Sequence, residues 1–195
     1  MKLRLLIPAC LLASQVAVAQ HESQWRLGLT LSAPTRLLSA SSLTAPDSVF
    51  GRVDLGFGVG ADAARSWLIQ PGMLGVVHVR VMTAEVQSQA AGSAWSPGRA
   101  LILEGKVRLE RVLSDRAALF GGVGVSHWSG PAGTLPFTGI ASLLLAAEAG
   151  VSLRPGGGPW RVDLTADLTR IGANDQRGMA TGFPLRWMAG VHHDL

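Results

Sequence analysis

An eight-stranded antiparallel β-barrel that spans a membrane is the fold class that the sequence predicts. The main evidence is a pattern that recurs about eight times between Trp25 and Leu195, in which apolar side chains alternate with charged, polar or small ones. Because successive side chains of a strand point to opposite faces, each stretch has one apolar face and one face that can carry ion pairs. Two further observations support the prediction: short turns alternate with long loops, and the chain begins with an export signal.

The N-terminal segment predicts export. Residues 1–19 resemble a cleaved signal peptide, in which Lys2 and Arg4 supply a positive start, a short apolar core follows, and small residues at 17–19 form the cleavage site. The apolar core is too short to cross a bilayer as a helix, which needs ~20 apolar residues. We therefore expect one mature domain, a barrel formed by residues 20–195.

The composition of the expected mature chain limits its functions. Cys10 lies in the signal peptide, so cleavage would leave no thiol for a disulfide or a metal site; lipidation at Cys10 is the alternative. Loss of Lys2 and Arg4 lowers the basic residues from 17 to 15, against 13 acidic ones. This small excess gives no support to nucleic-acid binding. Lys106 is then the one lysine among many arginines, and Arg is the cation that paired or buried sites favour.

Eight strands account for the alternating stretches. Their approximate ranges are 24–31, 49–61, 67–81, 101–113, 117–127, 139–153, 160–171 and 183–195. The third strand has its clearest alternation at Val77, Val79 and Val81, and Pro71 leaves its start open because proline cannot donate to a ladder. The even number of strands allows both ends of the chain to lie at the same rim.

The connections alternate between short and long. Tight turns marked by Gly, Pro or Asp are expected at 62–65, 114–116 and 154–159. Long segments rich in Ser, Ala, Gly and Pro occupy 32–48, 83–98, 129–138 and 172–182. Short turns at the periplasmic rim and longer external loops are typical of outer-membrane barrels, so we expect both termini at the periplasmic rim.

The last strand strengthens this interpretation. Residues 187–195 resemble the terminal assembly signal of such proteins, with Gly190 and alternating apolar or ring residues. The chain is therefore similar to the eight-stranded outer-membrane barrels of the OmpA and OmpX type. The resemblance implies a monomer in the outer membrane that contacts its lipids and meets the assembly machinery through the C-terminal strand. The final residue is Leu195 and Tyr is absent, so five other rings would form the aromatic girdles: Trp25, Trp67, Trp160, Phe137 and Phe183.

The charged face is expected to point into the barrel. Seven cationic and seven anionic residues make up the predicted interior network: Arg26, Arg52, Arg80, Lys106, Arg108, Arg161 and Arg186, with Asp54, Glu104, Glu110, Glu148, Asp163, Asp167 and Asp194. Unpaired charges in a narrow lumen would be unfavourable, so equal numbers predict a salt-bridged interior. Eight strands leave room only for side chains, which favours a plug over the alternative, an ion-selective pore.

No cofactor or metal site is predicted. The glycines at 56–60 and 121–124 lack the spacing of a dinucleotide-binding loop and open no helix, so we expect them to give room to long interior side chains. His192 and His193 are neighbours on one strand and point to opposite faces, so they cannot chelate one metal together. His78 is expected to be a lumen residue.

His127 and Ser129 are the catalytic candidates. Two residues apart on a strand, they share a face and could cooperate in acyl transfer. They resemble the His-x-Ser of the lipid A 3-O-deacylases, eight-stranded barrels whose His, Ser and Glu lie on the membrane-facing outside. The position of that family's Glu is Ala141 here, and Glu148 is expected to point inward. Because the triad needs an acid that orients the histidine, we expect no enzyme.

The sequence thus predicts a plugged outer-membrane barrel with a structural role or an adhesive role exerted through its external loops. A small pore, a deacylase-like enzyme that uses His127 and Ser129, and a soluble lipocalin-like binding barrel are the alternatives. The soluble barrel would turn its charged face to water, and a surface with one lysine is unusual for a soluble protein. The sequence indicates no ligand for the loops.

Overall fold

The computed structural model describes residues 23–39, 52–89, 96–129, 143–175 and 178–195. The predicted signal peptide, Phe137, Ala141 and parts of the long loops lie outside these residues. Among the described residues, no helix has the length and apolar character needed to cross a membrane.

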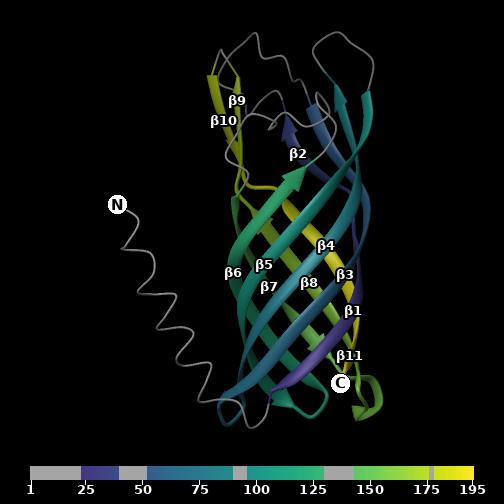
Figure 1. The fold of residues 1–195 in the computed structure, drawn as a ribbon, viewed down its shortest axis with the longest axis vertical. Helices are drawn as coiled ribbons and strands as arrows, with labels where there is room; N and C mark the ends of the chain where they lie inside the picture. Colours follow the sequence, from purple (N-terminus) through teal and green to yellow (C-terminus); the bar gives the residue numbers. More distant parts are fainter. Residues whose placement is uncertain (1–22, 40–51, 90–95, 130–142, 176–177) are drawn as a thin grey trace, which may run out of the picture.

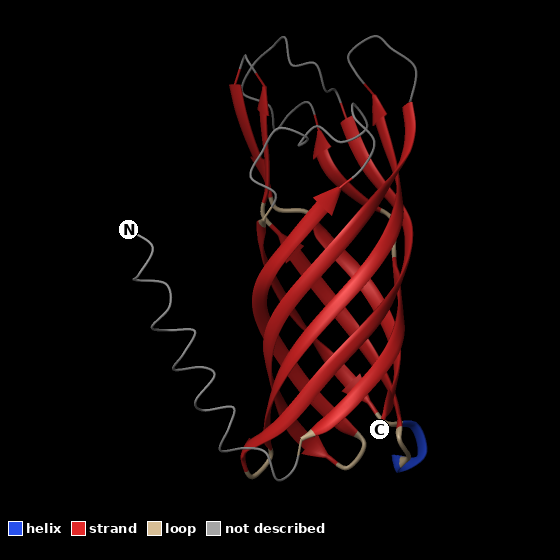
Figure 2. Ribbon diagram, viewed as in Figure 1, coloured by secondary structure: helices blue, strands red, loops and turns tan. Residues whose placement is uncertain are grey.

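Antiparallel strands that are tilted relative to the barrel axis form a closed barrel (Figures 1 and 2). The strands are β1 (Gln24–Ser32), β2 (Thr35–Ser39), β3 (Arg52–Gln70), β4 (Met73–Gln89), β5 (Ser96–Ser114), β6 (Ala117–Ser129), β7 (Leu144–Leu153), β8 (Trp160–Thr169), β9 (Ile171–Asp175), β10 (Gly178–Gly182) and β11 (Leu185–Asp194). The eight strands of the wall are β1, β3 to β8, and β11, and β1 closes the barrel by pairing with both β3 and β11. The predicted fold class is confirmed.

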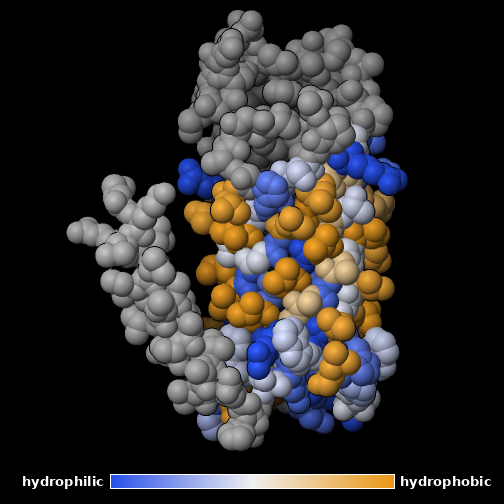
Figure 3. Space-filling view, in the orientation of Figure 1, coloured by the Kyte–Doolittle hydropathy of each residue, from blue (hydrophilic) through white to orange (hydrophobic). Residues whose placement is uncertain are grey.

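The outer wall of the barrel is apolar. Leu29, Val123 and Leu145 are 71%, 67% and 63% exposed, and many other large apolar side chains also point outward. They form a hydrophobic band across the middle of the barrel, and more hydrophilic residues gather at its lower end (Figure 3). A soluble barrel would have the opposite arrangement, so the lipocalin-like alternative is wrong. Such a wall needs an apolar surrounding, which in the cell is a lipid bilayer.

Aromatic side chains lie on this outer wall as expected for girdles. Trp25, Trp160 and Phe183 are half or more exposed, and Trp67 is half-buried. Trp187 and Phe57, which the sequence prediction did not include, also point outward.

The expected turn at 62–65 is wrong. β3 continues through these residues to Gln70, and the turn follows at Pro71 and Gly72, where the glycine has a φ of +76°. The alternation of β3 is unbroken across the segment, because Asp62, Ala64 and Ser66 are all buried on the lumen side. Asp62 is therefore a lumen residue and not a turn marker, and the next strand begins at Met73.

A β-bulge in β3 reverses which side chains point inward. The register with β4 shifts by one residue between Leu55 and Gly58, so one extra residue is inserted into β3. Below the bulge the even-numbered residues face the lumen, whereas above it Leu55 is fully buried inside. The prediction that Asp54 faces the lumen is wrong for this reason.

The strands also extend farther toward the external rim than predicted. β4 and β5 occupy most of the segment expected as the loop 83–98, and β9 and β10 form a separate hairpin that begins at Ile171 and covers the expected loop 172–182. The short turns after β5 and β7 lie where they were expected. The C-terminus lies at the rim of the short turns (Figure 1).

Candidate functional site

Inward side chains from seven of the eight wall strands, all except β6, bring charge into the lumen. Of the described residues, six cationic and six anionic ones are buried inside: Arg26, Arg80, Lys106, Arg108, Arg161 and Arg186, with Asp62, Glu104, Glu110, Glu148, Asp163 and Asp167. Arg154 and Asp194 add one more charge of each sign at the rim, where they are partly exposed. The balance of charge that the sequence predicts is therefore present, with Asp62 as a member that sequence reasoning missed.

Two predicted members of the network need separate comment. Asp54 lies on the wall above the bulge, where its carboxylate is 3.7 Å from Nε of the exposed Arg36. Its place in the interior network is corrected, because the extra residue in β3 reverses the direction of its side chain. The side chain of Arg52 lies outside the described part of the structure.

The periplasmic end of the network is built around Glu110. Arg26 Nη1 and Arg161 Nη1 lie 2.6 and 3.0 Å from the two oxygens of this carboxylate. Arg154 Nη2 contacts Asp194 at 2.6 Å beside them. A cavity of about 170 Å³ opens next to this cluster and is lined in part by Glu110 and Arg161, so water can reach this end of the network.

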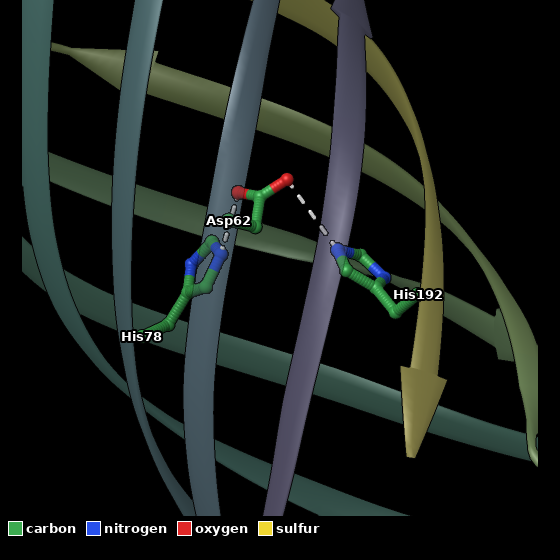
Figure 4. A group of neighbouring side chains, drawn as sticks. All are labelled: Asp62, His78 and His192. Atoms are coloured by element: carbon green, nitrogen blue, oxygen red, sulfur yellow. Dashed lines mark hydrogen bonds and ion pairs between the residues drawn. The ribbon is translucent and has the colours of Figure 1, made fainter. Parts of the chain in front are cut away.

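The middle of the lumen contains a closed ring of five side chains. Arg108 Nη1 contacts Asp163 at 3.1 Å, and Arg108 Nη2 is 3.0 Å from Nδ1 of His78. His78 Nε2 is 2.8 Å from Oδ1 of Asp62. His192 completes the ring, because its two nitrogens lie 3.4 Å from Asp62 and 3.6 Å from Asp163. Figure 4 shows Asp62 between the two imidazoles. The ring connects β3, β4, β5, β8 and β11 across the lumen.

Asp62, His78 and His192 have the donor set of a metal site. Their ligand atoms lie within 4.8 Å of one another, which suits a small divalent cation. Two guanidinium groups oppose this use. Arg80 Nε donates to Asp62 at 2.6 Å. Arg108 can only donate, so Nδ1 of His78 accepts and Nε2 carries the proton that is donated to Asp62. The contacts favour a hydrogen-bonded brace over a metal centre.

Two glycines make room for the imidazole of His192. A Cβ on Gly28 would overlap the ring of His192, and a Cβ on Gly190 would lie 2.7 Å from its Cε1. The expectation that glycines accommodate long interior side chains holds for Gly122, whose Cβ would lie 2.8 Å from that of Arg108. For Gly58 the neighbours are Met82 and Ser32 instead of arginines.

The inner part of the network surrounds Lys106. Its ammonium lies 3.2 Å from Glu104 and 3.2 Å from Glu148, and it also contacts Asp167. Arg186 contacts the same Glu104 and lies 2.7 Å from Asp167. All five side chains are at most 1% exposed to solvent. Their charges are therefore compensated by one another and not by water.

An apolar cluster lies in the lumen on the external side of the charges. Its members come from six strands: Leu37, Leu55, Met82, Ala84, Val86, Ala100, Ile102, Trp128 and Met188. The two layers are in contact, since the guanidinium of Arg186 lies 5.3 Å from the Trp128 ring and Arg80 Nη1 is 3.3 Å from the sulfur of Met188. The sequence contained a signal for this cluster. Along most of the contributing strands, the lumen-facing positions are charged near the periplasmic rim and become apolar toward the external rim.

The catalytic candidates lie apart from this site. His127 and Ser129 are half-buried on the outer face of β6, next to Leu103 and Leu101 of β5. The hydroxyl of Ser129 donates to the carbonyl of Leu101 at 3.5 Å. Glu148 lies inside the lumen, where Arg108 Nε is 2.8 Å away. The structure thus brings His127 and Ser129 together on one face and leaves Glu148 on the other side of the wall.

A closed eight-stranded wall, an apolar exterior and a charged interior define an outer-membrane β-barrel protein, and the outer membrane is its location. No protein-family model and no curated protein matches the sequence. Solved structures share the fold. Ail, the attachment invasion locus protein of Yersinia pestis, in complex with the heparin analogue sucrose octasulfate, is similar with a TM-score of 0.52 and 12% identity over 89% of this chain and 97% of its own. The outer membrane protein OprG of Pseudomonas aeruginosa is similar with a TM-score of 0.51 and 12% identity, over 89% of this chain and 95% of its own. At this identity, the likeness concerns the fold.

Proposed function

We propose that the protein is a non-conducting outer-membrane barrel whose filled lumen stabilises the wall and whose interactions are made by the external loops. The observation that carries the proposal is the filling of the lumen by two successive layers, the ion-pair network and the apolar cluster. An open pore needs a continuous hydrated path, and ion selectivity favours an excess of one charge. The described lumen residues offer neither, because their charges balance and the apolar cluster follows them.

The external loops are the remaining surface through which a partner can be bound. Ail, one of the proteins of similar fold, is an attachment invasion locus protein whose structure contains a heparin analogue, which supports a surface role for this class of barrel. Three of the four external loop segments of this chain carry little charge. Residues 40–51, 90–95 and 130–142 contain one charged residue, Asp47. A partner of these loops is therefore expected to make apolar and hydrogen-bonded contacts more than ionic ones.

The proposal includes no enzymatic activity. Acyl transfer by Ser129 needs a base held in the correct tautomer by an acid, and the acid nearest in sequence on the C-terminal side, Glu148, is engaged by Lys106 and Arg108 inside the lumen. The arrangement of His127 and Ser129 on the outer face therefore supports a role in the wall.

Conductance tests the closed lumen directly. The mature protein, reconstituted in a planar lipid bilayer, is expected to show no steady conductance, whereas Trp128→Ala combined with Ile102→Ala should give brief openings because it truncates two side chains of the apolar cluster that are paired in register. A reproducible ion-selective current through the unmodified protein would contradict the proposal.

A loop replacement tests the second part of the proposal. A variant with residues 130–142 replaced by a Gly-Ser linker of equal length should still insert, because the wall strands are unchanged. Cells that display this variant should lose adhesion to surfaces that cells displaying the unmodified protein bind. Equal adhesion by both would count against a role for this loop.

A further inference from the structure

The arginines on the outside of the barrel differ from those inside. Each buried arginine of the described lumen contacts a carboxylate. Among the described residues, four outward arginines have no carboxylate within ion-pair distance: Arg65, Arg99, Arg111 and Arg170. An uncompensated guanidinium at the edge of a lipid-facing wall has its natural partner outside the protein, in the headgroups of the lipid.

Arg65 is the outward arginine whose position is most closely fixed. It lies on β3 toward the periplasmic end of the strand and pairs in register with Trp25 of β1. Its guanidinium lies 5.5 Å from the centre of the Trp25 ring, a cation–π distance. Arg65 Nη2 also donates to the hydroxyl of Ser23 at 3.0 Å. A guanidinium has five N–H donors, so most of them remain available while these two contacts hold the group in place.

Two more rings lie on the outer wall on the next two strands beyond β1, in the neighbouring order β3, β1, β11, β8. Trp160 of β8 and His193 of β11 pack edge to face with their centres 4.8 Å apart, and His193 pairs with β1 two residues from Trp25. We call Trp25, Arg65, Trp160 and His193 the interfacial patch. Both indoles are half exposed, as expected for tryptophan at the level of lipid headgroups. The neighbouring Asp194 points inward to Arg154, so it does not neutralise Arg65.

We propose that the interfacial patch binds the headgroup of an anionic phospholipid of the periplasmic leaflet, such as phosphatidylglycerol. The guanidinium can hold two phosphate oxygens at once, and the neighbouring indole of Trp25 can pack on the glycerol region. Because Arg65 has no carboxylate partner among the described residues, it favours a headgroup with net negative charge. A zwitterionic headgroup would bring an ammonium group to a patch in which the described residues offer no outward carboxylate. The site goes beyond the proposed function and does not depend on whether the lumen conducts.

Native mass spectrometry of the mature protein in detergent tests the site. The protein is titrated with phosphatidylglycerol or phosphatidylethanolamine of identical acyl chains. We expect the first phosphatidylglycerol to bind about fivefold more tightly, the ratio for one basic residue at an anionic surface. Arg65→Gln should reduce this ratio to near one. Arg116→Gln is the matched control, because Arg116 lies in a turn at the same rim and faces Asp115 at 3.9 Å; it should keep the preference.

Three outcomes would overturn the proposal. Equal affinity of the unmodified protein for the two lipids would do so without any variant. An unchanged ratio in Arg65→Gln that still shows the gel shift of a folded barrel would exclude Arg65 as the ligand. An equal loss in Arg116→Gln would show general attraction to a positive rim and no site. Inorganic phosphate, added at the lipid concentration, is expected not to displace the lipid, since it cannot use the rings; displacement would show a simple phosphate site.

Discussion

Lys106 shows at the scale of one residue why the lumen needs balanced charge. Its ammonium is surrounded by three carboxylates from β5, β7 and β8, and it is fully buried. Removing one member of a buried ion-pair network destabilises a protein more than replacing the whole network by apolar residues, because the remaining partners stay buried without compensation. Strand alternation places Lys106 on the same face as Glu104 and Arg108, and once that face is assigned to the lumen this part of the network could be predicted from the sequence.

Lys106→Met is expected to lower the free energy of unfolding by about 3–5 kcal/mol. The reason is that Glu104, Glu148 and Asp167 would lose a shared cation while Met fills a similar volume. The measurement is reversible urea unfolding of the protein in lipid vesicles. Arg116→Met, which removes a cation from an exposed pair, should change stability by no more than about 0.5 kcal/mol. Equal effects of the two substitutions would show that the lumen is hydrated and its charges screened.

Asp62 and Asp54 show where single-residue reasoning fails. An Asp between small residues is a common turn signal, so Asp62 was expected in a turn, yet in a barrel the same residue can point into a polar lumen. Asp54 was misplaced for another reason. The bulge between Leu55 and Gly58 depends on how β3 pairs with β4. The sequence of β3 by itself does not determine this register, so the bulge could not be predicted from it. The closed ring around His78 depends on Asp62 and was missed with it.

At the scale of the strands, glycine sets how closely β5 and β6 approach. Gly124 faces the lumen opposite Lys106, and a Cβ there would lie 2.7 Å from Cα of Lys106 and would also overlap the carbonyl of Gly105. Gly105 lies on the neighbouring strand β5, and a Cβ at this position would meet no atom within 4 Å. The strand ranges could be predicted from alternation, but this difference between two glycines depends on the register of the pair.

Gly124→Ala is therefore expected to destabilise the barrel by about 1–3 kcal/mol, the usual effect of overpacking, because backbone atoms of β5 would have to move. Gly105→Ala is the control with the same change in composition, and it should shift stability by less than about 0.5 kcal/mol. Unfolding in vesicles again gives the measurement. If the two variants were equally stable, the inference that β5 and β6 approach closely at Gly124 would be contradicted.

The barrel closes where the first wall strand, β1, pairs with the last, β11. We call this pairing the seam, and the ion-pair network strengthens it. β1 pairs with β11 from Arg26 opposite Asp194 to Ser32 opposite Met188. The same Arg26 contacts Asp194 at 3.4 Å and Glu110 of the distant β5. Ion pairs therefore connect the seam to the opposite wall, which is consistent with a lumen whose role is to stabilise the closed form.

At the scale of the whole molecule, the distribution of polarity is inverted relative to a soluble protein. The buried part of the lumen carries equal numbers of opposite charges, and the surface carries exposed leucine, valine and tryptophan. Sequence alternation revealed two faces but could not by itself assign them to water or lipid. That assignment needed the export signal, the scarcity of lysine and the alternation of short and long connections. The signal peptide stays a prediction.

The inverted polarity predicts how the whole protein behaves during fractionation. The mature protein should be recovered with outer membranes, because its outer wall would aggregate or bind lipid in water. Extracted in detergent and kept unheated, it should migrate differently on a gel from the boiled protein, since the closed barrel remains compact until heat breaks the seam. Lys106→Met should lose the compact band at a lower temperature than Arg116→Met, which connects the gel assay to the interior network. Recovery as a soluble periplasmic protein with one gel mobility would show that the apolar face is not in contact with lipid.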